Sequence, residues 1–225
     1  MSSYIPQLYD FLSRLAENNN REWFTANKAE YDELRKLWLA VLQRMIDAMS
    51  LWEPAIKHLQ ARSCAYRIYR DVRFSFNKEP YKTWFAASMS PSGRKPHSAG
   101  YYIQLDPRPG EGGLYGGIWH PEAPVLRKLR NAIVDNIEEF EEATVSPEID
   151  RYFPGWCGDR LKSAPKGWDK NHPYVELLRL KDYGKFCPCD KDFFLNPDWP
   201  QEAAERLHLL KPFVDFLNYS AMEEL

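Results

Sequence analysis

The sequence contains no run of apolar residues that approaches the roughly 20 needed to cross a bilayer as a helix. Its opening Met-Ser-Ser-Tyr lacks the basic stretch and the apolar stretch of a secretion signal. We therefore expect a cytoplasmic protein without membrane association, whose four cysteines stay reduced. An excess of charge is also missing, since 30 Lys and Arg against 32 Asp and Glu give a formal net charge of −2. This balance excludes a protein that coats nucleic acid through overall positive charge.

Familiar signatures of catalysis and metal binding are missing as well. His-Glu-x-x-His and Gly-x-Ser-x-Gly do not occur. Cys187 and Cys189 are separated by one residue, and no second Cys or His pair lies near enough in the sequence to complete a zinc site. The sequence therefore predicts no metal, names no cofactor, and leaves open whether the protein is an enzyme.

Periodic apolar residues predict helices at both ends of the chain. One helix is expected from Ile5, and a second from a capping box at Asn19 and Glu22 to about Ser50. Further helices are expected from Pro121, Pro173 and Asp198. Pro212 should kink or split the last of these, because a proline inside a helix removes a backbone hydrogen bond.

Alternation of apolar and polar residues predicts strands between these helices. The period of two extends over 66–76. Two further strands, expected at 101–106 and 113–119 on either side of a Pro- and Gly-rich turn, form an antiparallel hairpin. The combined pattern predicts a single α+β domain over residues 1–225, with an antiparallel sheet packed by N-terminal and C-terminal helices.

One segment combines cations and aromatic rings more densely than the rest of the chain. Its candidate ligand-binding residues are Arg67, Arg70, Arg73, Lys78, Tyr81 and Lys82. Guanidinium forks and ammonium groups suit phosphate or carboxylate. Alternation places Arg70 on the buried face of the predicted strand, where it needs a carboxylate, carbonyl or ligand as partner. The alternative is a set of structural ion pairs within the strand.

Four residues outside this segment are also candidates for ligand contact. Trp119 directly precedes a predicted helix start, and Arg130 lies beside the apolar stripe of that helix, from which we expect it to reach the same site. Lys166 belongs to a basic loop. The alternative interpretation of the lysines in this loop is that they are solvated and bind no ligand. Trp23 is expected as an apolar wall. The glycine-rich stretch 110–117 matches no phosphate-binding fingerprint and is interpreted as a hairpin with close backbone approach.

Several short motifs resemble a known family over nearly the whole chain. They are Asn19-Asn20-Arg21-Glu22-Trp23-Phe24, Tyr69-Arg70-Asp71-Val72-Arg73-Phe74-Ser75, Lys78-Glu79-Pro80-Tyr81-Lys82-Thr83, Gly116-Gly117-Ile118-Trp119 and Ala164-Pro165-Lys166-Gly167. In these motifs the chain is similar to the conserved family called domain of unknown function 2461. The resemblance implies no activity, cofactor or catalytic residue. The chain departs from the family pattern at Asn77, where an acidic residue is expected, which weakens the idea of an essential carboxylate there.

Two functions of different classes fit these residues. The first is a small-molecule-binding protein or enzyme whose basic, aromatic cleft takes a phosphate- or carboxylate-bearing ligand, with Trp23, Tyr81 and Trp119 as walls. The second is an RNA- or protein-binding module with an exposed basic and aromatic sheet face, although nucleic acid is the less favoured partner. A purely structural arginine network is the third interpretation. A hollow around Arg70 and Trp119 favours the first function. The oligomeric state is not fixed by the sequence.

Overall fold

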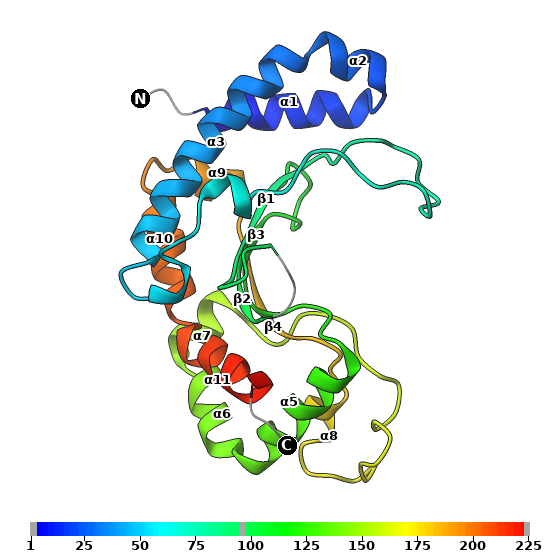
Figure 1. Cartoon of the computed structure of the whole chain (residues 1–225), viewed down its shortest axis with the longest axis vertical. Coiled ribbons are helices and arrows are strands. Elements are labelled where there is room, and N and C mark those ends of the chain that lie inside the picture. The colour runs from blue at the N-terminus through cyan, green and yellow to red at the C-terminus, as the bar shows by residue number, and fades with distance from the viewer. Residues whose placement is uncertain (1–3, 95–97, 223–225) are drawn as a thin grey trace.

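The computed structural model describes residues 4–94 and 98–222, and it contains a four-stranded sheet with helices on one face (Figure 1). The strands are β1 (Phe85–Met89), β2 (Gly100–Leu105), β3 (Gly113–Ile118) and β4 (Tyr183–Pro188). Neighbouring strands are antiparallel, in the order β1-β2-β3-β4. The predicted α+β class is confirmed, and the strands predicted at 101–106 and 113–119 are β2 and β3.

The N-terminal helices are α1 (Ile5–Glu17), α2 (Arg21–Ala26) and α3 (Lys28–Met49). The predicted capping box at Asn19 is wrong by one residue, since Asn20 caps α2 by accepting a hydrogen bond of 2.9 Å from the backbone N–H of Trp23. The predicted continuous helix is also interrupted, at Asn27. The side-chain amide of Asn27 donates to the carbonyl of Trp23 at 2.8 Å, a local bond that competes with helix continuation.

The remaining helices lie before β1 or after β3 in the sequence, the latter on either side of β4. They are α4 (Ala61–Cys64), α5 (Ala123–Asp135), α6 (Ile137–Thr144), α7 (Pro147–Tyr152), α8 (Val175–Leu178), α9 (Lys191–Leu195), α10 (Trp199–His208) and α11 (Lys211–Met222), with a short 3-10 helix at Pro54–Ile56. The break between α10 and α11 confirms the split expected at Pro212. Within the described ranges, no helix has both the length and the apolar character that a bilayer crossing requires.

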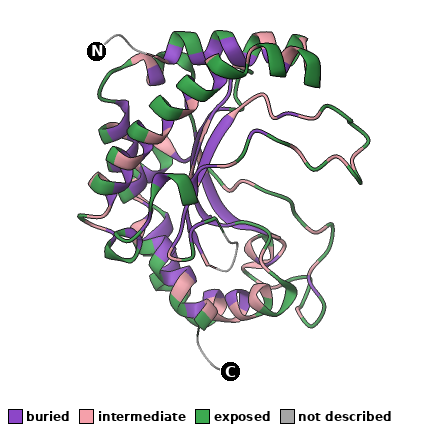
Figure 2. Ribbon diagram, turned by 45° about the horizontal axis from the view of Figure 1, so that its top comes forward, coloured by how far each residue is buried: buried purple, intermediate pink, exposed green. Residues whose placement is uncertain are grey.

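The core lies between the sheet and the helices from both chain ends. Helices α10 and α11 pack on β3, and α3 packs on α10. On β2, Tyr101, Ile103 and Leu105 point into this layer and are almost fully buried. Figure 2 shows the buried strands and the inward helix surfaces in purple. Burying each such side chain contributes about 1.5–3 kcal/mol, so this layer fixes the position of the sheet.

The predicted strand at 66–76 is wrong. Residues 66–84 form a long protruding loop, here called the arm, which joins the rest of the chain near β1 (Figure 1). The backbones of its two sides pair at its base, where Tyr69 and Tyr81 form an isolated bridge. Beyond that bridge the Asp71 carboxylate accepts the backbone N–H of Arg73 at 3.2 Å, and this local turn replaces the extended pairing that the alternation predicted.

Candidate functional site

The sheet face opposite the helices carries a row of side chains that crosses all four strands. Ser88 of β1 pairs with Tyr102 of β2, Tyr102 with Tyr115 of β3, and Tyr115 with Phe186 of β4. In a strand, successive side chains point to opposite faces, so these residues stand opposite the layer that packs against the helices. The row forms the centre of the candidate site.

A neighbouring row on the same face consists of glycines, which leave room beside the rings. Gly100 pairs with Gly117, and Gly117 pairs with Gly184. A Cβ on Gly184 would lie 2.2 Å from the Tyr115 hydroxyl, and a Cβ on Gly117 would lie 2.2 Å from the carbonyl oxygen of Tyr183. Gly117 also has a φ of +141°, which side-chain-bearing residues rarely adopt. The expected close backbone approach of the glycine-rich hairpin is thus confirmed.

A pocket of about 640 Å³ lies over these two rows. This volume falls in the range of roughly 300–1,000 Å³ that small-molecule sites occupy. Aromatic residues provide much of its wall: Tyr66, Trp84, Tyr102, Tyr115, Trp119 and Phe186. The first two belong to the base of the arm, and Trp119 follows β3. The arm therefore flanks one end of the pocket, while Cys157 and Gly158 from the long connection before β4 also line it.

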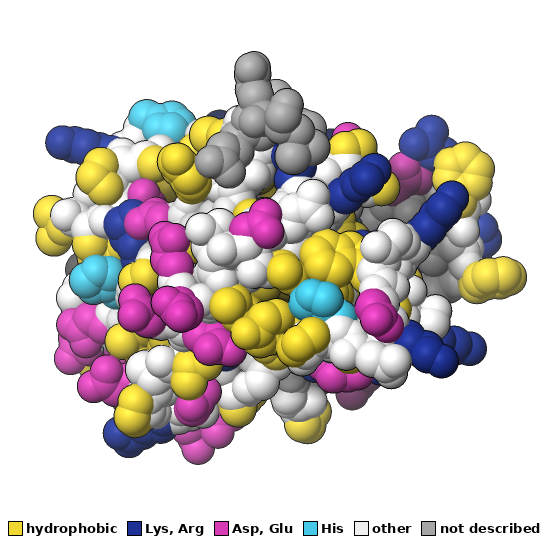
Figure 3. Space-filling model, turned by 90° about the horizontal axis from the view of Figure 1, so that it is seen from below, with side chains coloured by type: hydrophobic (Ala, Val, Ile, Leu, Met, Phe, Trp, Pro, Cys, Tyr) yellow, Lys and Arg dark blue, Asp and Glu magenta, His cyan; other side chains and the backbone are white. Residues whose placement is uncertain are grey.

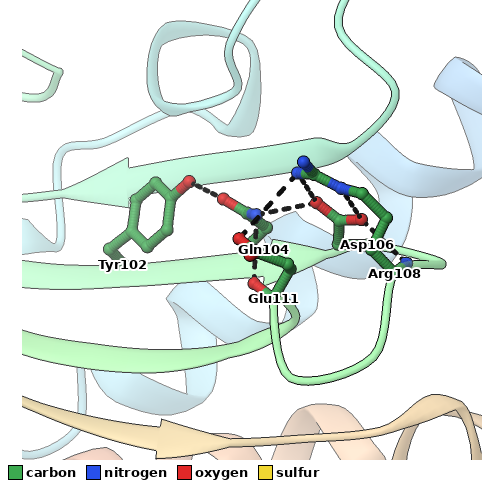
Figure 4. Close-up of polar contacts among 5 residues, drawn as sticks. All are labelled: Tyr102, Gln104, Asp106, Arg108 and Glu111. Carbon is green, nitrogen blue, oxygen red and sulfur yellow. Dashed lines mark hydrogen bonds and ion pairs between the residues drawn. The ribbon is translucent and has the colours of Figure 1, made fainter.

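A hydrogen-bond network orients the polar groups of β2 within the pocket (Figure 4). The Tyr102 hydroxyl donates to the side-chain oxygen of Gln104. The Gln104 amide nitrogen then donates to Asp106 Oδ2 and to the Glu111 carbonyl, each at 3.0 Å. Because Arg108 binds the buried Asp106 carboxylate at 2.6 Å, the whole chain of bonds is anchored. Because the Tyr102 hydroxyl is the donor in this bond, its oxygen can still act as an acceptor.

Cations gather at the arm end of the pocket. The Lys82 ammonium lies 5.3 Å from the centre of the Trp84 ring and 6.0 Å from that of Tyr66, two rings of the pocket wall. Arg94 lines the pocket directly, and its guanidinium donates to the Ala65 carbonyl at 2.9 Å. This end of the pocket is therefore suited to a negatively charged group.

The charge at this end is reflected in the titration of Lys82. Burial lowers the pKa of its ammonium group, because a desolvated cation is disfavoured. The positive charges of Arg67, Arg70 and Arg94 lower that pKa further. The lowered pKa thus has two causes, burial first and the neighbouring positive charges second.

The opposite end of the pocket holds neutral and buried polar groups. The Tyr115 hydroxyl is buried and has no hydrogen-bond partner among the described residues. Burial is the main cause that raises the pKa of Tyr115, and it raises the pKa of the Cys157 thiol to about 11. Both groups therefore keep their protons at neutral pH, and Cys157 lacks the thiolate that a cysteine nucleophile requires.

A buried carboxyl group lies behind this end. Asp182 accepts the backbone N–H of His120 through Oδ1, whereas its Oδ2 has no partner within the part of the chain that is described. Gly158, which lines the pocket, covers that oxygen so closely that a Cβ there would lie 2.9 Å from it. His120 adopts a φ of +47°, an uncommon conformation for a non-glycine residue, next to the half-exposed Trp119.

The structure places two of the three predicted arginines of the arm, Arg70 and Arg73, in local ion pairs, whereas Arg67 is exposed. Arg70 donates to the carbonyl of Glu79 at 3.1 Å and lies 3.7 Å from its carboxylate, so the partner expected for Arg70 is Glu79. Arg73 binds the Asp71 carboxylate at 2.7 Å, and both side chains are mostly exposed. These pairs stabilise the shape of the arm and leave neither guanidinium in the pocket wall.

The predicted lysines of the arm bind backbone carbonyls. Lys78 donates to the carbonyl of Val72 at 3.1 Å. Lys82 donates to the carbonyls of Arg67 and Tyr69 at 2.6 and 3.1 Å. The ammonium of Lys82 thus links the first side of the arm to the second, close to the pocket end described above.

The other predicted residues lie in separate places. Of them, Trp119 lines the pocket. Tyr81 is buried at the base of the arm and stacks on Phe24, while Trp23 packs in the N-terminal helices. Arg130 is buried and donates to the Leu180 carbonyl at 2.9 Å, and Lys166 is exposed on the long loop before α8. The structure therefore does not bring the predicted residues together in one hollow.

The sequence patterns did not predict most of the pocket residues. Tyr102 and Gln104 alternate with the apolar core residues of a strand that was predicted, so that alternation already pointed them to the opposite face. Asp182 and Cys157 carried no comparable signal, because their placement depends on the long connection between β3 and β4.

The Cys-Pro-Cys sequence lies outside the pocket. The Sγ atoms of Cys187 and Cys189 are 3.9 Å apart, and an Arg206 nitrogen lies 3.5 Å from that of Cys187. The hydrogen bond from Cys189 and then the Arg206 guanidinium lower the pKa of Cys187 to about 7. The described residues contain no group of three or more His, Cys, Asp or Glu side chains that could hold a metal ion.

Comparison with known proteins places the chain in a family without assigning an activity. No curated protein matches the sequence, and no solved structure matches the fold. A family model described as conserved hypothetical protein (DUF2461) matches residues 7–216. The chain, matched over nearly its whole length, belongs to the DUF2461 family.

Proposed function

We propose that the chain binds a small molecule that combines a flat apolar body with an anionic group, in the pocket on the uncovered face of the sheet. The observation that carries this proposal is the coincidence of an aromatic-walled hollow with cations at one end. The flat body would pack between rings such as Trp84 and Trp119, and the anionic group would face Arg94 and Lys82.

The polar groups of the pocket support recognition of this ligand. Tyr102 offers a fixed acceptor, and the unpartnered Tyr115 hydroxyl offers a donor to a ligand atom. A buried polar group without a partner costs roughly 1–3 kcal/mol, and a ligand that satisfies it recovers that cost. The proposal concerns binding, and it includes the cytoplasmic location favoured by the sequence, with which the four free thiols are consistent.

Matched pairs of ligands test this proposal. Each pair contains a planar molecule with and without a phosphate or carboxylate, such as 1-naphthyl phosphate and 1-naphthol, or a nucleoside monophosphate and its nucleoside. We expect the anionic member of at least one pair to raise the melting temperature more than the neutral member does. The Arg94→Gln variant should weaken binding of the anionic member by about 10- to 100-fold, the worth of a charged hydrogen bond of roughly 1.5–3 kcal/mol.

Two further variants make the test specific. Ser88→Trp would fill the pocket from β1 and should abolish binding of both members of a pair. Arg62→Gln removes an exposed cation on α4, outside the pocket wall, and should leave binding unchanged. Equal shifts from charged and neutral ligands, or equal losses in the Arg62 and Arg94 variants, would count against the proposal.

A further inference from the structure

The arm carries large apolar side chains that the fold leaves in water. Phe74 is 94% exposed and Phe76 is 106% exposed, while Tyr69 nearer the base is 51% exposed. Isolated exposed rings are ordinary on a protein surface, but two fully exposed phenylalanines on one protruding loop are not. Figure 3 shows hydrophobic side chains among Lys and Arg at the right edge of the molecule, the side on which Figure 1 places the arm.

The rings are presented by an ordered loop. Backbone hydrogen bonds of 2.8 Å from Arg70 to Pro80 and of 2.7 Å from Lys82 to Ile68 close the base of the arm. Toward the tip, the Asn77 side chain accepts the backbone N–H of Glu79 at 2.8 Å. A loop fixed in this way loses less conformational entropy when it binds, so the exposed rings are already organised for contact.

The charge of the arm is opposite to that of the rest of the chain. Residues 66–84 contain five Lys or Arg and two Asp or Glu, a formal charge of +3, whereas the whole chain carries −2 and the remainder therefore −5. Arg67 is exposed, and among the described residues neither Arg67 nor Lys78 forms an ion pair with a carboxylate. The partner that fits this surface is an anion.

Rings and cations are interspersed along the arm, in the order Arg67, Tyr69, Arg70, Arg73, Phe74, Phe76 and Lys78. A single-stranded nucleic acid offers a partner to both kinds of side chain, since bases stack on aromatic rings while phosphates contact Lys and Arg. Arg73 lies over one face of Phe74, with 5.8 Å between its guanidinium carbon and the ring centre, which leaves the other face for a base.

We propose that the arm is a contact site for single-stranded nucleic acid, with Phe74 and Phe76 stacking on bases and Arg67, Arg73 and Lys78 contacting phosphates. A bilayer fits this surface less well. It would require the apolar groups at one depth, whereas Tyr69 lies at the base of the arm and the Phe residues lie toward its tip.

The test is fluorescence anisotropy of a short fluorescein-labelled oligothymidylate titrated with the full chain. Phe74→Ala and Phe76→Ala should each weaken binding at least fivefold, because stacking is worth about 1–3 kcal/mol per base. Tyr219→Ala removes an exposed ring on α11 and should have no effect. The melting temperature should change little in the Phe variants, because the rings are exposed.

Salt dependence measures the phosphate contacts separately. For single strands the slope of log K against log salt is about −0.7 per phosphate, so three contacts predict a slope of about −2. Lys78→Gln should reduce the slope by about 0.7, whereas Lys57→Gln, an exposed cation away from the arm, should leave it unchanged. Retained binding in the pocket-filling variant Ser88→Trp would show that the arm acts independently of the pocket.

Three results would overturn the proposal. The first is no binding of the oligonucleotide, or equal binding of the Phe variants. The second is binding of the chain to phosphatidylserine-containing vesicles, lost in the Phe variants, without binding of the oligonucleotide, which would assign the arm to a membrane surface. The third is self-association that disappears in the Phe variants, again without oligonucleotide binding, which would assign the arm to a second copy of the chain.

Discussion

The hydroxyl of Tyr115 occupies the space in which Gly184 would carry a Cβ, only 2.2 Å from that position. The two residues lie on adjacent strands, and the ring of one rests across the backbone of the other. The pocket depends on this arrangement, because the glycine lets the ring lie flat along the floor instead of standing up into the cavity.

Gly184→Ala should therefore lower the free energy of unfolding by about 1–3 kcal/mol, the usual cost of overpacking. Chemical denaturation measures the change. In the background of Tyr115→Ala, which removes the ring, the same glycine substitution should cost much less. If Gly184→Ala lowers the free energy of unfolding equally in wild type and in Tyr115→Ala, the new Cβ does not clash with the Tyr115 ring.

Tyr115→Phe should leave the free energy of unfolding unchanged or raise it by up to about 1 kcal/mol, because the hydroxyl that it removes is buried without a partner. The matched control is Tyr101→Phe, which removes a buried hydroxyl that donates to the Glu53 carboxylate at 3.1 Å. The control should cost about 1.5–3 kcal/mol, as for a hydrogen bond to a charged group. A loss of similar size at Tyr115 would reveal a protein partner for its hydroxyl.

The base of the arm depends on Asn19. Its side-chain amide donates to the Tyr81 carbonyl at 3.0 Å and accepts the Tyr81 backbone N–H at 3.1 Å, as a neighbouring strand would. Asn19→Ala should cost about 1–3 kcal/mol, since it removes both bonds. It should also speed hydrogen exchange across the arm.

Asn18→Ala serves as the control for that experiment. Asn18, at the C-terminal end of α1, donates its side-chain amide to the Arg14 carbonyl of that helix. Faster exchange in the arm of the Asn18 variant, or unchanged exchange in the Asn19 variant, would show that Asn19 does not specifically hold the base of the arm.

The ionisation of Cys187 can be followed by thiolate absorbance near 240 nm, with Cys187→Ser as reference. We expect a transition near pH 7, because the Cys189 thiol and then Arg206 stabilise the Cys187 thiolate. Cys189→Ala and Arg206→Gln should each raise this pKa. A wild-type transition near pH 9, the ordinary thiol value, would show that Cys189 and Arg206 do not stabilise the Cys187 thiolate.

The same shift sets a direction for stability. The folded pKa of Cys187 lies below its ordinary value, so its contribution is fully present above about pH 9 and is lost as the pH falls through about 7. The pKa of Cys189 is raised, first by the hydrogen bond to Cys187. Above pH 9, where the thiol of the unfolded chain ionises, this raised pKa lowers the stability. The difference in unfolding free energy between wild type and Cys187→Ser should therefore grow from pH 7 to pH 9.

The strands predicted at 101–106 and 113–119 are present as β2 and β3, whereas the period-two alternation over 66–76 predicted a strand that does not form there. The difference lies in burial, because Ile103 and Leu105 meet the helices, whereas Phe74 and Phe76 meet no other element. A sequence pattern records which residues can alternate, and only tertiary contacts decide whether a partner strand exists.

The site was predictable only in part for a related reason. The cations of the arm were visible as a dense cluster, but their partners, Asp71 and Glu79, lie within the same loop and hold it together. The pocket instead depends on cross-strand register, which aligns Tyr102 with Tyr115 and which no local pattern contains.

The most direct test of the proposed pocket is an amide NMR titration with the anionic members of the matched ligand pairs. We predict that signals of Gly100, Gly117 and Gly158 shift with at least one ligand, and that these shifts disappear in Ser88→Trp. If no such ligand moves these signals, or if the shifts lie on the helices behind the sheet and persist in Ser88→Trp, the pocket does not bind the proposed class of ligand.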